Sequence, residues 1–143
     1  MKITQISIFL ENRKGRLYEV CNLLAKHGIN LLALTIAETE GFGVLRIIAD
    51  RPSDAISLLK ENSFTAKLTD VVVAEIEDSP GGLAKILKVL DDADLNIEYM
   101  HAFLARKSPA AYMVFRFDEP DRAIAVLRDA GVNVIGNNRI NGL

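Results

Sequence analysis

Two loops combine residue types that bind small charged molecules. The first reads ENRKGRL over residues 11–17 and the second reads EDSPGGL over residues 77–83. Each precedes a helix-like segment, and the first turn of a helix presents unpaired backbone N–H groups and a partial positive charge to a carboxylate. Glycine lets a ligand approach the backbone closely. Asn12 or Asp78 offers an acceptor for an ammonium group, so one loop can address both charges of an amino acid.

The same residues also have a purely structural explanation. Asn, Asp and Ser are ordinary N-cap residues, worth about 1 kcal/mol each to a helix. Asn12, Asp78 and Ser79 can therefore start a helix without binding a ligand. Lys14 or Arg16 adds a cation toward a carboxylate in the first loop alone. We interpret the loops as binding sites that also cap helices, and capping alone stays open as the alternative.

The two loops belong to a repeated sequence. At an offset of 66 (83 minus 17) and later 68 (120 minus 52), apolar and turn residues coincide. The pairs are Leu17 and Leu83, Leu24 and Leu90, Asn30 and Asn96, Pro52 and Pro120, and Leu59 and Leu127. We assign the two extra residues to a longer hairpin loop near RKSPAA, residues 106–111. Such self-similarity indicates duplicated units, which we place at residues 1–68 and 69–143.

Each copy begins with a strand and a helix. In residues 3–11, Ile6, Ile8 and Leu10 alternate with polar residues, which predicts a strand with one buried face. The equivalent strand is VVVAEIE, residues 71–77. The helix that follows ends where Gly28 suits a left-handed cap, and Asp94 holds the same place in the second copy.

Two further strands, a helix that begins near a proline and a last strand complete each copy. The last strand is expected around residues 65–69 and again around residues 132–137. The order β-α-β-β-α-β, used twice, predicts an α+β chain of two tandem ferredoxin-like domains. Each has an antiparallel sheet with its helices on one face. This fold hosts many unrelated activities, so it does not define a function.

On these loops and this order, the sequence resembles the ACT domain family, small-molecule-sensing modules of amino-acid metabolism. The family loop resembles Asn/Asp-x-Pro-Gly-x-Leu, and its helix often ends in Gly-x-Asn. The second copy matches at Asp78, Pro80, Gly81, Leu83 and Asn96, and the first at Asn12, Gly15, Leu17 and Asn30. The first copy departs from the pattern, with Lys14 opposite Pro80 and Arg16 opposite Gly82. The two loops therefore need not bind equally well or bind the same molecule.

The resemblance covers essentially the whole chain and implies a non-catalytic regulatory protein that binds a free amino acid. It implies that two such domains pair edge to edge, with ligand sites where they meet, and that an enzyme of amino-acid metabolism is regulated in trans. We expect ligand contacts from Asn12, Arg13, Lys14, Gly15, Arg16, Leu17, Asn30, Asp78, Ser79, Pro80, Gly81, Gly82, Leu83 and Asn96. For Asn30 and Asn96, a turn role is equally open. The alternative function is a protein-interaction or structural module without a ligand.

Other functional classes find little support. His27 and His101 have no evident nucleophile partner, and Cys21 matches Leu87, which indicates a core residue and not a nucleophile. No metal-ligand spacing or glycine-rich phosphate motif suggests a metal or a cofactor. A net charge of −2 argues against nucleic-acid binding. No apolar run is long enough to span a membrane, and a single cysteine fits a reducing cytoplasm.

The sheet face away from the helices predicts an assembly. By alternation, this face carries Phe9, Leu32, Leu34, Val44 and Ile48 in the first copy, and Glu75, Glu98, Met100, Tyr112 and Arg116 in the second. An apolar sheet face usually marks an interface. Two-fold symmetry is the commonest way in which soluble homo-oligomers close. We therefore expect a homodimer in which the first copies stack face to face.

Overall fold

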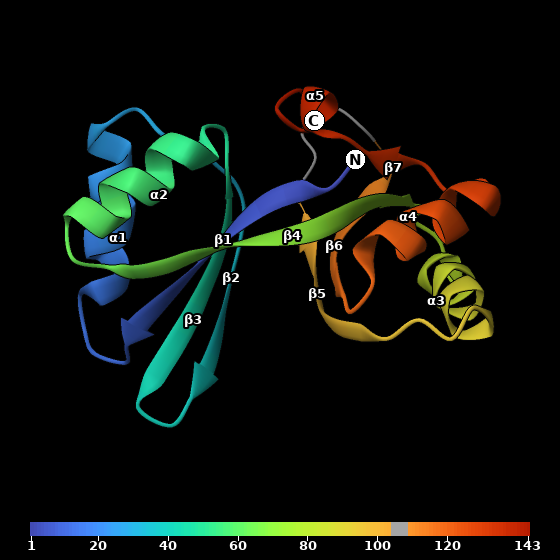
Figure 1. Ribbon diagram of the computed structural model, residues 1–143, viewed down its shortest axis with the longest axis horizontal. Coiled ribbons are helices and arrows are strands. Elements are labelled where there is room, and N and C mark those ends of the chain that lie inside the picture. Colours follow the sequence, from blue (N-terminus) through green and yellow to red (C-terminus); the bar gives the residue numbers. More distant parts are fainter. Residues whose placement is uncertain (104–108) are drawn as a thin grey trace. The chain divides into compact units, whose positions relative to one another are not determined.

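The computed structural model describes residues 1–103 and 109–143. Of the predicted longer hairpin loop, residues 106–108 lie outside the described part. The chain divides into two compact units. We call Thr4–Thr69 the N-terminal unit, and Asp70–Leu143 together with Met1–Ile3 the C-terminal unit. Both contain the β-α-β-β-α-β order labelled in Figure 1, which confirms the predicted α+β fold of two tandem ferredoxin-like repeats.

The N-terminal unit orders its strands β2-β3-β1-β4 in an antiparallel arrangement. Apolar side chains of β1 and β3 pack with α1 and α2 into one core, which includes Ile8, Leu45, Val20 and Leu59. Each such side chain contributes about 1.5–3 kcal/mol when fully buried. The elements are β1 (Ile3–Glu11), α1 (Arg16–Lys26), β2 (Leu31–Thr39), β3 (Phe42–Ala49), α2 (Pro52–Glu61) and β4 (Thr65–Ile76).

The C-terminal unit repeats this order as β7-β4-β6-β5. Its core joins β4 and β6 to α3 and α4. It contains Phe115 and Phe117, whose rings stack with centroids 5.4 Å apart. The elements are α3 (Gly82–Asp92), β5 (Ile97–Phe103), β6 (Ala111–Phe117), α4 (Pro120–Asp129), β7 (Val134–Ile135) and α5 (Asn137–Ile140).

The junction between the repeats differs from the prediction. The sequence indicated two separate strands, whereas β4 runs without a break from Thr65 to Ile76. No glycine or proline interrupts residues 65–76, so nothing in the local sequence forces a turn. The last strand of the first repeat is therefore also the first strand of the second.

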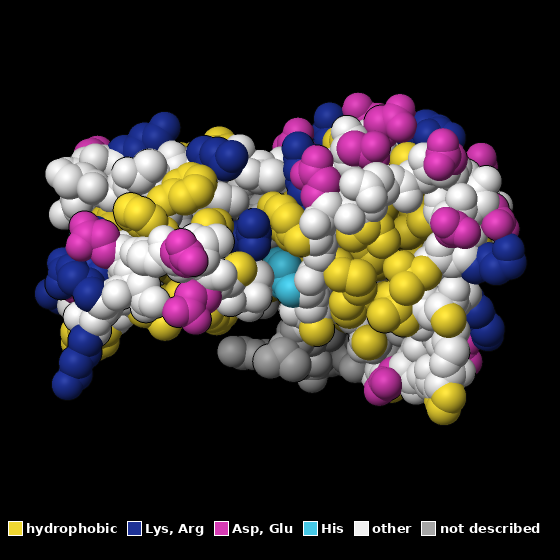
Figure 2. Space-filling view, turned by 90° about the horizontal axis from the view of Figure 1, so that it is seen from below, with side chains coloured by type: hydrophobic (Ala, Val, Ile, Leu, Met, Phe, Trp, Pro, Cys, Tyr) yellow, Lys and Arg dark blue, Asp and Glu magenta, His cyan; other side chains and the backbone are white. Residues whose placement is uncertain are grey.

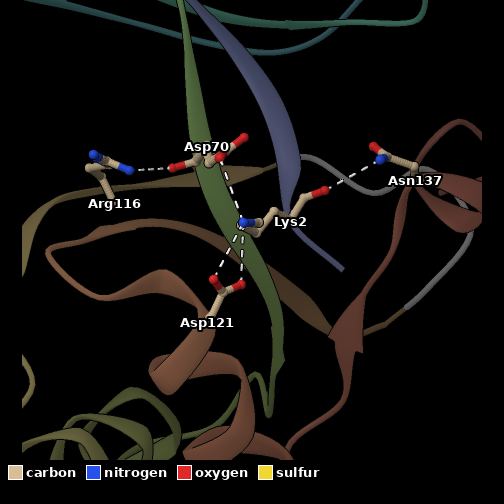
Figure 3. Close-up of polar contacts among 5 residues, drawn as sticks. All are labelled: Lys2, Asp70, Arg116, Asp121 and Asn137. Atoms are coloured by element: carbon tan, nitrogen blue, oxygen red, sulfur yellow. Dashed lines mark hydrogen bonds and ion pairs between the residues drawn. The ribbon is translucent and has the colours of Figure 1, made fainter.

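The first residues of the chain belong to the C-terminal unit. The Nζ atom of Lys2 lies 3.3 Å from Oδ1 of Asp121 and 3.9 Å from Oδ2 of Asp70. Asn137 Nδ2 donates a 3.3 Å hydrogen bond to the Lys2 carbonyl oxygen. Arg116 donates to the backbone oxygen of Asp70 from the other side (Figure 3). The start of β1 is thereby fastened to β4, α4 and the segment after β7.

Both left-handed helix ends were predicted correctly. Gly28 follows α1 with φ +68°, and Asp94 follows α3 with φ +55°. Ile29 N donates to Leu24 O and Leu95 N donates to Leu90 O, so the two helices end with the same hydrogen bond. A short polar residue tolerates this conformation where glycine would be the default.

The predicted sheet faces were partly wrong. β1 is buried on both faces, because Gln5 and Ser7 are as inaccessible as their apolar neighbours. A bulge in β2 between Leu31 and Ala33 then shifts the register, so that Leu34 lies opposite the core residue Ile47. An extra residue in one strand reverses the face of every later side chain. Leu34 therefore lies on the helix side of the sheet, although its side chain is 53% exposed.

Several other residues assigned to the open face are also placed differently. Ile48 is buried at 1% exposure and Tyr112 at 3%. A bulge in β5 between Ile97 and Tyr99 sets Met100 opposite the core residue Phe115. Two of the five first-copy residues, Leu34 and Ile48, therefore do not belong to an exposed open face. Phe9 is 40% exposed, and the predicted stacking of first-copy sheets stays a prediction.

The end of the chain is more compact than predicted. β7 contains only Val134 and Ile135, and residues 137–140 form a short helix that the sequence pattern did not indicate. Ile140 is buried at 5% exposure, which gives this segment an apolar anchor.

No helix among the described residues is both long and apolar enough to cross a membrane.

Candidate functional site

The two loops adopt the same backbone turn. In the first, Arg13 N donates to Glu11 O at 2.8 Å and Glu19 N to Gly15 O at 3.0 Å. At equivalent places in the second, Ser79 N donates to Glu77 O at 2.9 Å and Lys85 N to Gly81 O at 3.1 Å. The repeated sequence therefore encodes a repeated turn that leads directly into α1 and α3.

Glycine occupies the N-cap position of both helices. Gly15 has φ +92° and Gly81 has φ +84°, the left-handed region that glycine enters without steric cost. Neither helix has a side-chain cap hydrogen bond. The interpretation of Asn12, Asp78 and Ser79 as N-caps is therefore wrong, because each precedes the N-cap glycine. The first-turn N–H groups are left without a side-chain acceptor, as an anion site requires.

A cavity of about 290 Å³ lies beside the first loop. Its polar lining comes from Glu11, Asn12, Arg13 and Arg16 together with Glu38 of β2. Leu17 and Ile36 are among the apolar side chains that line it. The lining thus has both charge signs and an apolar part, which is the usual composition of a small-molecule site.

Asn12 is held in place by a distant residue. Its Nδ2 donates a 2.9 Å hydrogen bond to Oε1 of Glu38, 26 residues further along the chain. The backbone N–H of Asn12 donates to Gly41 O in the β2–β3 turn. Glu38 and Ile36 were not predicted from the sequence, because their position depends on the register of β2 after its bulge.

Arg16 is the most constrained cation of the first loop. Its Nη1 donates to Oε2 of Glu19 at 2.7 Å, and its guanidinium carbon lies 4.6 Å from the ring centroid of Phe64. Its Nε is buried without a hydrogen-bond partner among the described residues. Buried donors are nearly always satisfied in folded proteins, so an unsatisfied one beside a cavity calls for an explanation.

The second loop lies beside a cavity of about 620 Å³ with an acidic lining. Glu75, Glu77 and Asp78 contribute carboxylates, while Lys85 is the one cation in this lining among the described residues. Lys85 Nζ lies 3.3 Å from Oε2 of Glu77. Asn133 Nδ2 donates to Oε2 of Glu75 at 2.7 Å. The net negative charge of this lining favours a cationic group over a carboxylate.

Glycine is needed at position 82 for a different reason than at position 81. A Cβ atom built on Gly82 would lie 2.0 Å from the backbone oxygen of Glu77. The second turn is therefore closed so tightly that no side chain fits at this position, where the first repeat carries Arg16. The two loops have equivalent backbone hydrogen bonds. In the second loop, however, the Glu77 backbone lies so close to the first helical turn that only glycine fits at position 82.

The other residues predicted to contact a ligand do not line these two cavities. Asn30 and Asn96 follow the far ends of α1 and α3, and a helix of 11 residues is about 16 Å long. Asn30 pairs with Asp50 through its backbone, with Asp50 N donating to Asn30 O at 3.0 Å. The two cavity linings omit Lys14, Gly15, Ser79, Pro80, Gly81, Gly82 and Leu83. Of the second-loop residues predicted to bind a ligand, Asp78 alone lines the cavity.

The other reactive residue types are placed as follows. His27 lies at the C-terminal end of α1, with Nδ1 3.0 Å from Leu23 O. Cys21 is half-buried rather than a core residue, and burial raises the pKa of its thiol above the ordinary value. Among the described residues, no group of three or more His, Cys, Asp and Glu side chains is arranged to hold a metal ion.

Comparison with known proteins identifies relatives of the whole chain. The family model described as an ACT domain pair matches residues 1–142. A protein from Bacteroides thetaiotaomicron with a crystal structure is 42% identical, with 100% of this chain and 98% of that one covered and a TM-score of 0.93. The regulatory subunit of aspartate kinase from Thermus thermophilus has a similar fold, with a TM-score of 0.65 at 18% identity over 89% and 91% of the two chains.

A curated sequence gives a partial match. The acetolactate synthase small subunit of Buchnera aphidicola subsp. Baizongia pistaciae is 35% identical over 79 residues. The match covers 54% of this chain and 50% of that protein. The chain thus spans about half the length of the curated relative it matches.

Proposed function

This chain belongs to the ACT domain pair family, and from that premise we propose that it is a non-catalytic regulatory protein that binds a free amino acid. We place the principal site in the cavity beside Asn12 and Arg16. The two relatives named as subunits of amino-acid-metabolic enzymes, aspartate kinase and acetolactate synthase, support a regulatory role in trans.

The Arg16 side chain carries the proposal. It lines the cavity with 19% of its surface exposed, and a ligand carboxylate there would accept a charge-assisted hydrogen bond from its guanidinium group. The first-turn N–H groups of α1 favour the same anion. Arg16 then acts as a positioning group for the carboxylate, held by Glu19 and Phe64.

The ammonium group and the side chain of the ligand have matching surfaces in the same cavity. Glu38 and the amide oxygen of Asn12 supply acceptors for an ammonium group. Leu17 and Ile36 supply an apolar surface, which favours an aliphatic side chain over a charged one. At about 290 Å³ the cavity is small, so a single amino acid fits the site better than a peptide.

The second loop is a weaker candidate for the same ligand. Its acidic lining opposes a carboxylate, and Gly82 leaves no room for a cation equivalent to Arg16. We therefore propose one amino-acid site in the N-terminal unit and a different role for the second cavity. The predicted contacts from Lys14, Pro80 and Asn96 stay predictions.

A homodimer remains part of the proposal, with a different surface. β2 is the outermost strand of the N-terminal unit, and Leu34 and Ile36 on it are 53% and 51% exposed. An apolar, exposed edge strand is prone to pair with another chain. A second copy offers the same edge, so antiparallel pairing about a two-fold axis is self-complementary.

A thermal-shift screen of the common amino acids, followed by calorimetry, tests the proposed function. A ligand present at about 100 times its dissociation constant adds about 2.7 kcal/mol to the stability of the folded state. We expect aliphatic amino acids to give the largest shifts, and Arg16→Gln to remove them while Lys88→Gln, an exposed cation on α3, retains them. A full panel without shift or heat would favour the interaction-module alternative.

A further inference from the structure

A third cavity lies in the C-terminal unit, and its lining shares Gly131, Val132 and Asn133 with that of the cavity beside the second loop. It has a volume of about 860 Å³ and lies where α4, β7 and α5 meet the first residue of the chain. Its charged lining consists of Arg128 and Arg139. No carboxylate lines it among the residues that the structure describes. In a chain of net charge −2, this local excess of positive charge is distinctive.

Three asparagines complete the polar lining. Asn133, Asn137 and Asn138 each supply an amide group with two N–H donors and one oxygen acceptor. Together with the two guanidinium groups, they make the lining rich in hydrogen-bond donors. Such a set suits a ligand with several oxygen atoms and at least one negative charge.

The donors are held in position by the surrounding structure. Asn133 lies between Glu75, to which its Nδ2 donates at 2.7 Å, and Arg139, whose Nη1 donates to its Oδ1 at 3.3 Å. Glu75 N also donates to the Asn133 carbonyl oxygen at 2.9 Å. Asn137 is held through the Lys2 carbonyl oxygen, as Figure 3 shows. Preorganised donors lose little entropy when a ligand binds.

Arg128 is the free cation of the group. It lies in the last turn of α4, where a positive charge interacts favourably with the helix dipole. It makes no ion pair with any described residue, so its guanidinium is available to a ligand. Helix stability explains why a cation occurs at this position. It does not explain why Arg139 and three amides from a different segment surround the same cavity.

The chemistry of the lining narrows the ligand. The side chains other than Arg and Asn are Met1, Val132 and Val134, with two glycines. None of the described lining residues is aromatic, so a nucleobase would have no stacking surface. A hydroxylated or polycarboxylated anion matches the amides and guanidinium groups better than a nucleotide does.

We propose that this cavity is an anion-binding site, separate from the two loops, for a small oxyanion-bearing metabolite such as a sugar phosphate or a polycarboxylate. Arg128 and Arg139 neutralise the charge, and Asn133, Asn137 and Asn138 bind the oxygen atoms. The site is independent of the proposed amino-acid site, because the two share no residues. Its occupancy stabilises the contact between Asn137 and Lys2, and therefore the attachment of the first residues to the C-terminal unit.

Titration of the isotope-labelled full chain with inorganic phosphate, pyrophosphate and citrate, followed by amide NMR, tests this proposal. We expect saturable shifts concentrated at residues 128–139 and at Lys2. Citrate shifts at lower concentration than phosphate would identify the polycarboxylate class, and the reverse would identify the phosphate class. Shifts scattered over all basic residues, without saturation, would mean unspecific ion binding and would overturn the proposal.

A double variant and a matched control complete the test. Arg128→Gln with Arg139→Gln should weaken binding of the tighter probe by tenfold or more. Lys88→Gln on α3, which removes a positive charge in the same unit far from this lining, should retain the wild-type affinity. An unchanged affinity in the double variant would overturn the proposal. If that variant does not fold, the position of the wild-type shifts still decides it.

Discussion

The N-terminal and C-terminal units have the same backbone design but different surfaces. Their loops share the same turn hydrogen bonds and the same left-handed N-cap glycine. The side chains on this turn differ, since Asn12 and Arg16 in one loop correspond to Asp78 and Gly82 in the other. Duplication has therefore retained what the backbone needs, while the residues that can bind a ligand have diverged.

The distribution of apolar side chains shows the same contrast. Apart from Met1, every large hydrophobic side chain exposed among the described residues lies in the N-terminal unit. In the C-terminal unit, the corresponding described positions carry polar, half-buried or small residues. Glu75 corresponds to Phe9, Met100 to Leu34 and Ala102 to Ile36. On the face that Figure 2 shows, the largest group of hydrophobic side chains lies over the C-terminal unit, on the right, so the contrast concerns the strongly exposed side chains and not all apolar surface. This difference supports the proposal that the N-terminal unit contacts a second copy of the chain.

The largest expected effect concerns assembly. Leu34→Glu on β2 should convert the homodimer into folded monomers, because it places a charge in an apolar edge contact. Ala102→Glu, at the site equivalent to Ile36 on the edge strand of the C-terminal unit, should leave the dimer intact. Sedimentation at micromolar concentration measures both. A wild-type monomer, or equal effects of the two substitutions, would remove the functional distinction between the units.

The next effect concerns the tightness of the second turn. Gly82→Ala should lower the free energy of unfolding by about 3 kcal/mol, since the new Cβ would meet the Glu77 backbone oxygen and the turn must move. Gly131→Ala is the control, because it has φ +80° but open space around it. It should cost about 1 kcal/mol. Similar values for both variants in urea denaturation would show that the second turn is no tighter than its surroundings.

The third effect separates the two loops as ligand sites. Gly15→Asp should remove the ligand-induced stabilisation of about 2.7 kcal/mol that a saturating amino acid provides, because a carboxylate at the N-cap repels that of the ligand. Gly81→Asp, at the second loop, should leave this shift unchanged, because the proposed amino-acid site lies beside the first loop. Calorimetry of each variant gives affinity and stoichiometry. The reverse result would assign the principal site to the second loop.

The smallest effect concerns ion pairs at the start of the two helices. Lys85 and Glu77 are 74% and 65% exposed, so Lys85→Ala should change stability by less than about 0.5 kcal/mol. Arg16 is only 19% exposed, and it also contacts Phe64. Arg16→Ala should therefore cost about 1 kcal/mol or more. Equal values in thermal denaturation would contradict the buried role assigned to Arg16.

The sequence predicted the fold well because its signals are local or repeated. Alternation in β1, helix-end residues such as Gly28 and Asp94, and proline at the start of α2 each act within a few residues. The family resemblance, based on the two loops, is confirmed by a family match over residues 1–142. Such features can be recognised in the sequence without knowledge of the tertiary structure.

The features that sequence reasoning missed depend on the tertiary structure. The bulge in β2 has no signature in residues 31–33, yet it moves Leu34 to the other face. The contact between Asn12 and Glu38 requires the finished β2–β3 hairpin. Helix α5 has four residues, too few for a periodic pattern. Candidate site residues were therefore predicted where they share a loop and missed where another element supplies them.

The attachment of Lys2 affects how the protein is made. Lys2 binds Asp121 and Asn137, which lie 119 and 135 positions further along the chain. During synthesis Lys2 therefore emerges well before Asp121 and Asn137, and these contacts form only after Asn137 has left the ribosome. Contacts so distant in sequence slow folding because the closure of a long loop must come first. A fragment that contains only the second repeat would lack Lys2 and its contacts with Asp121 and Asn137.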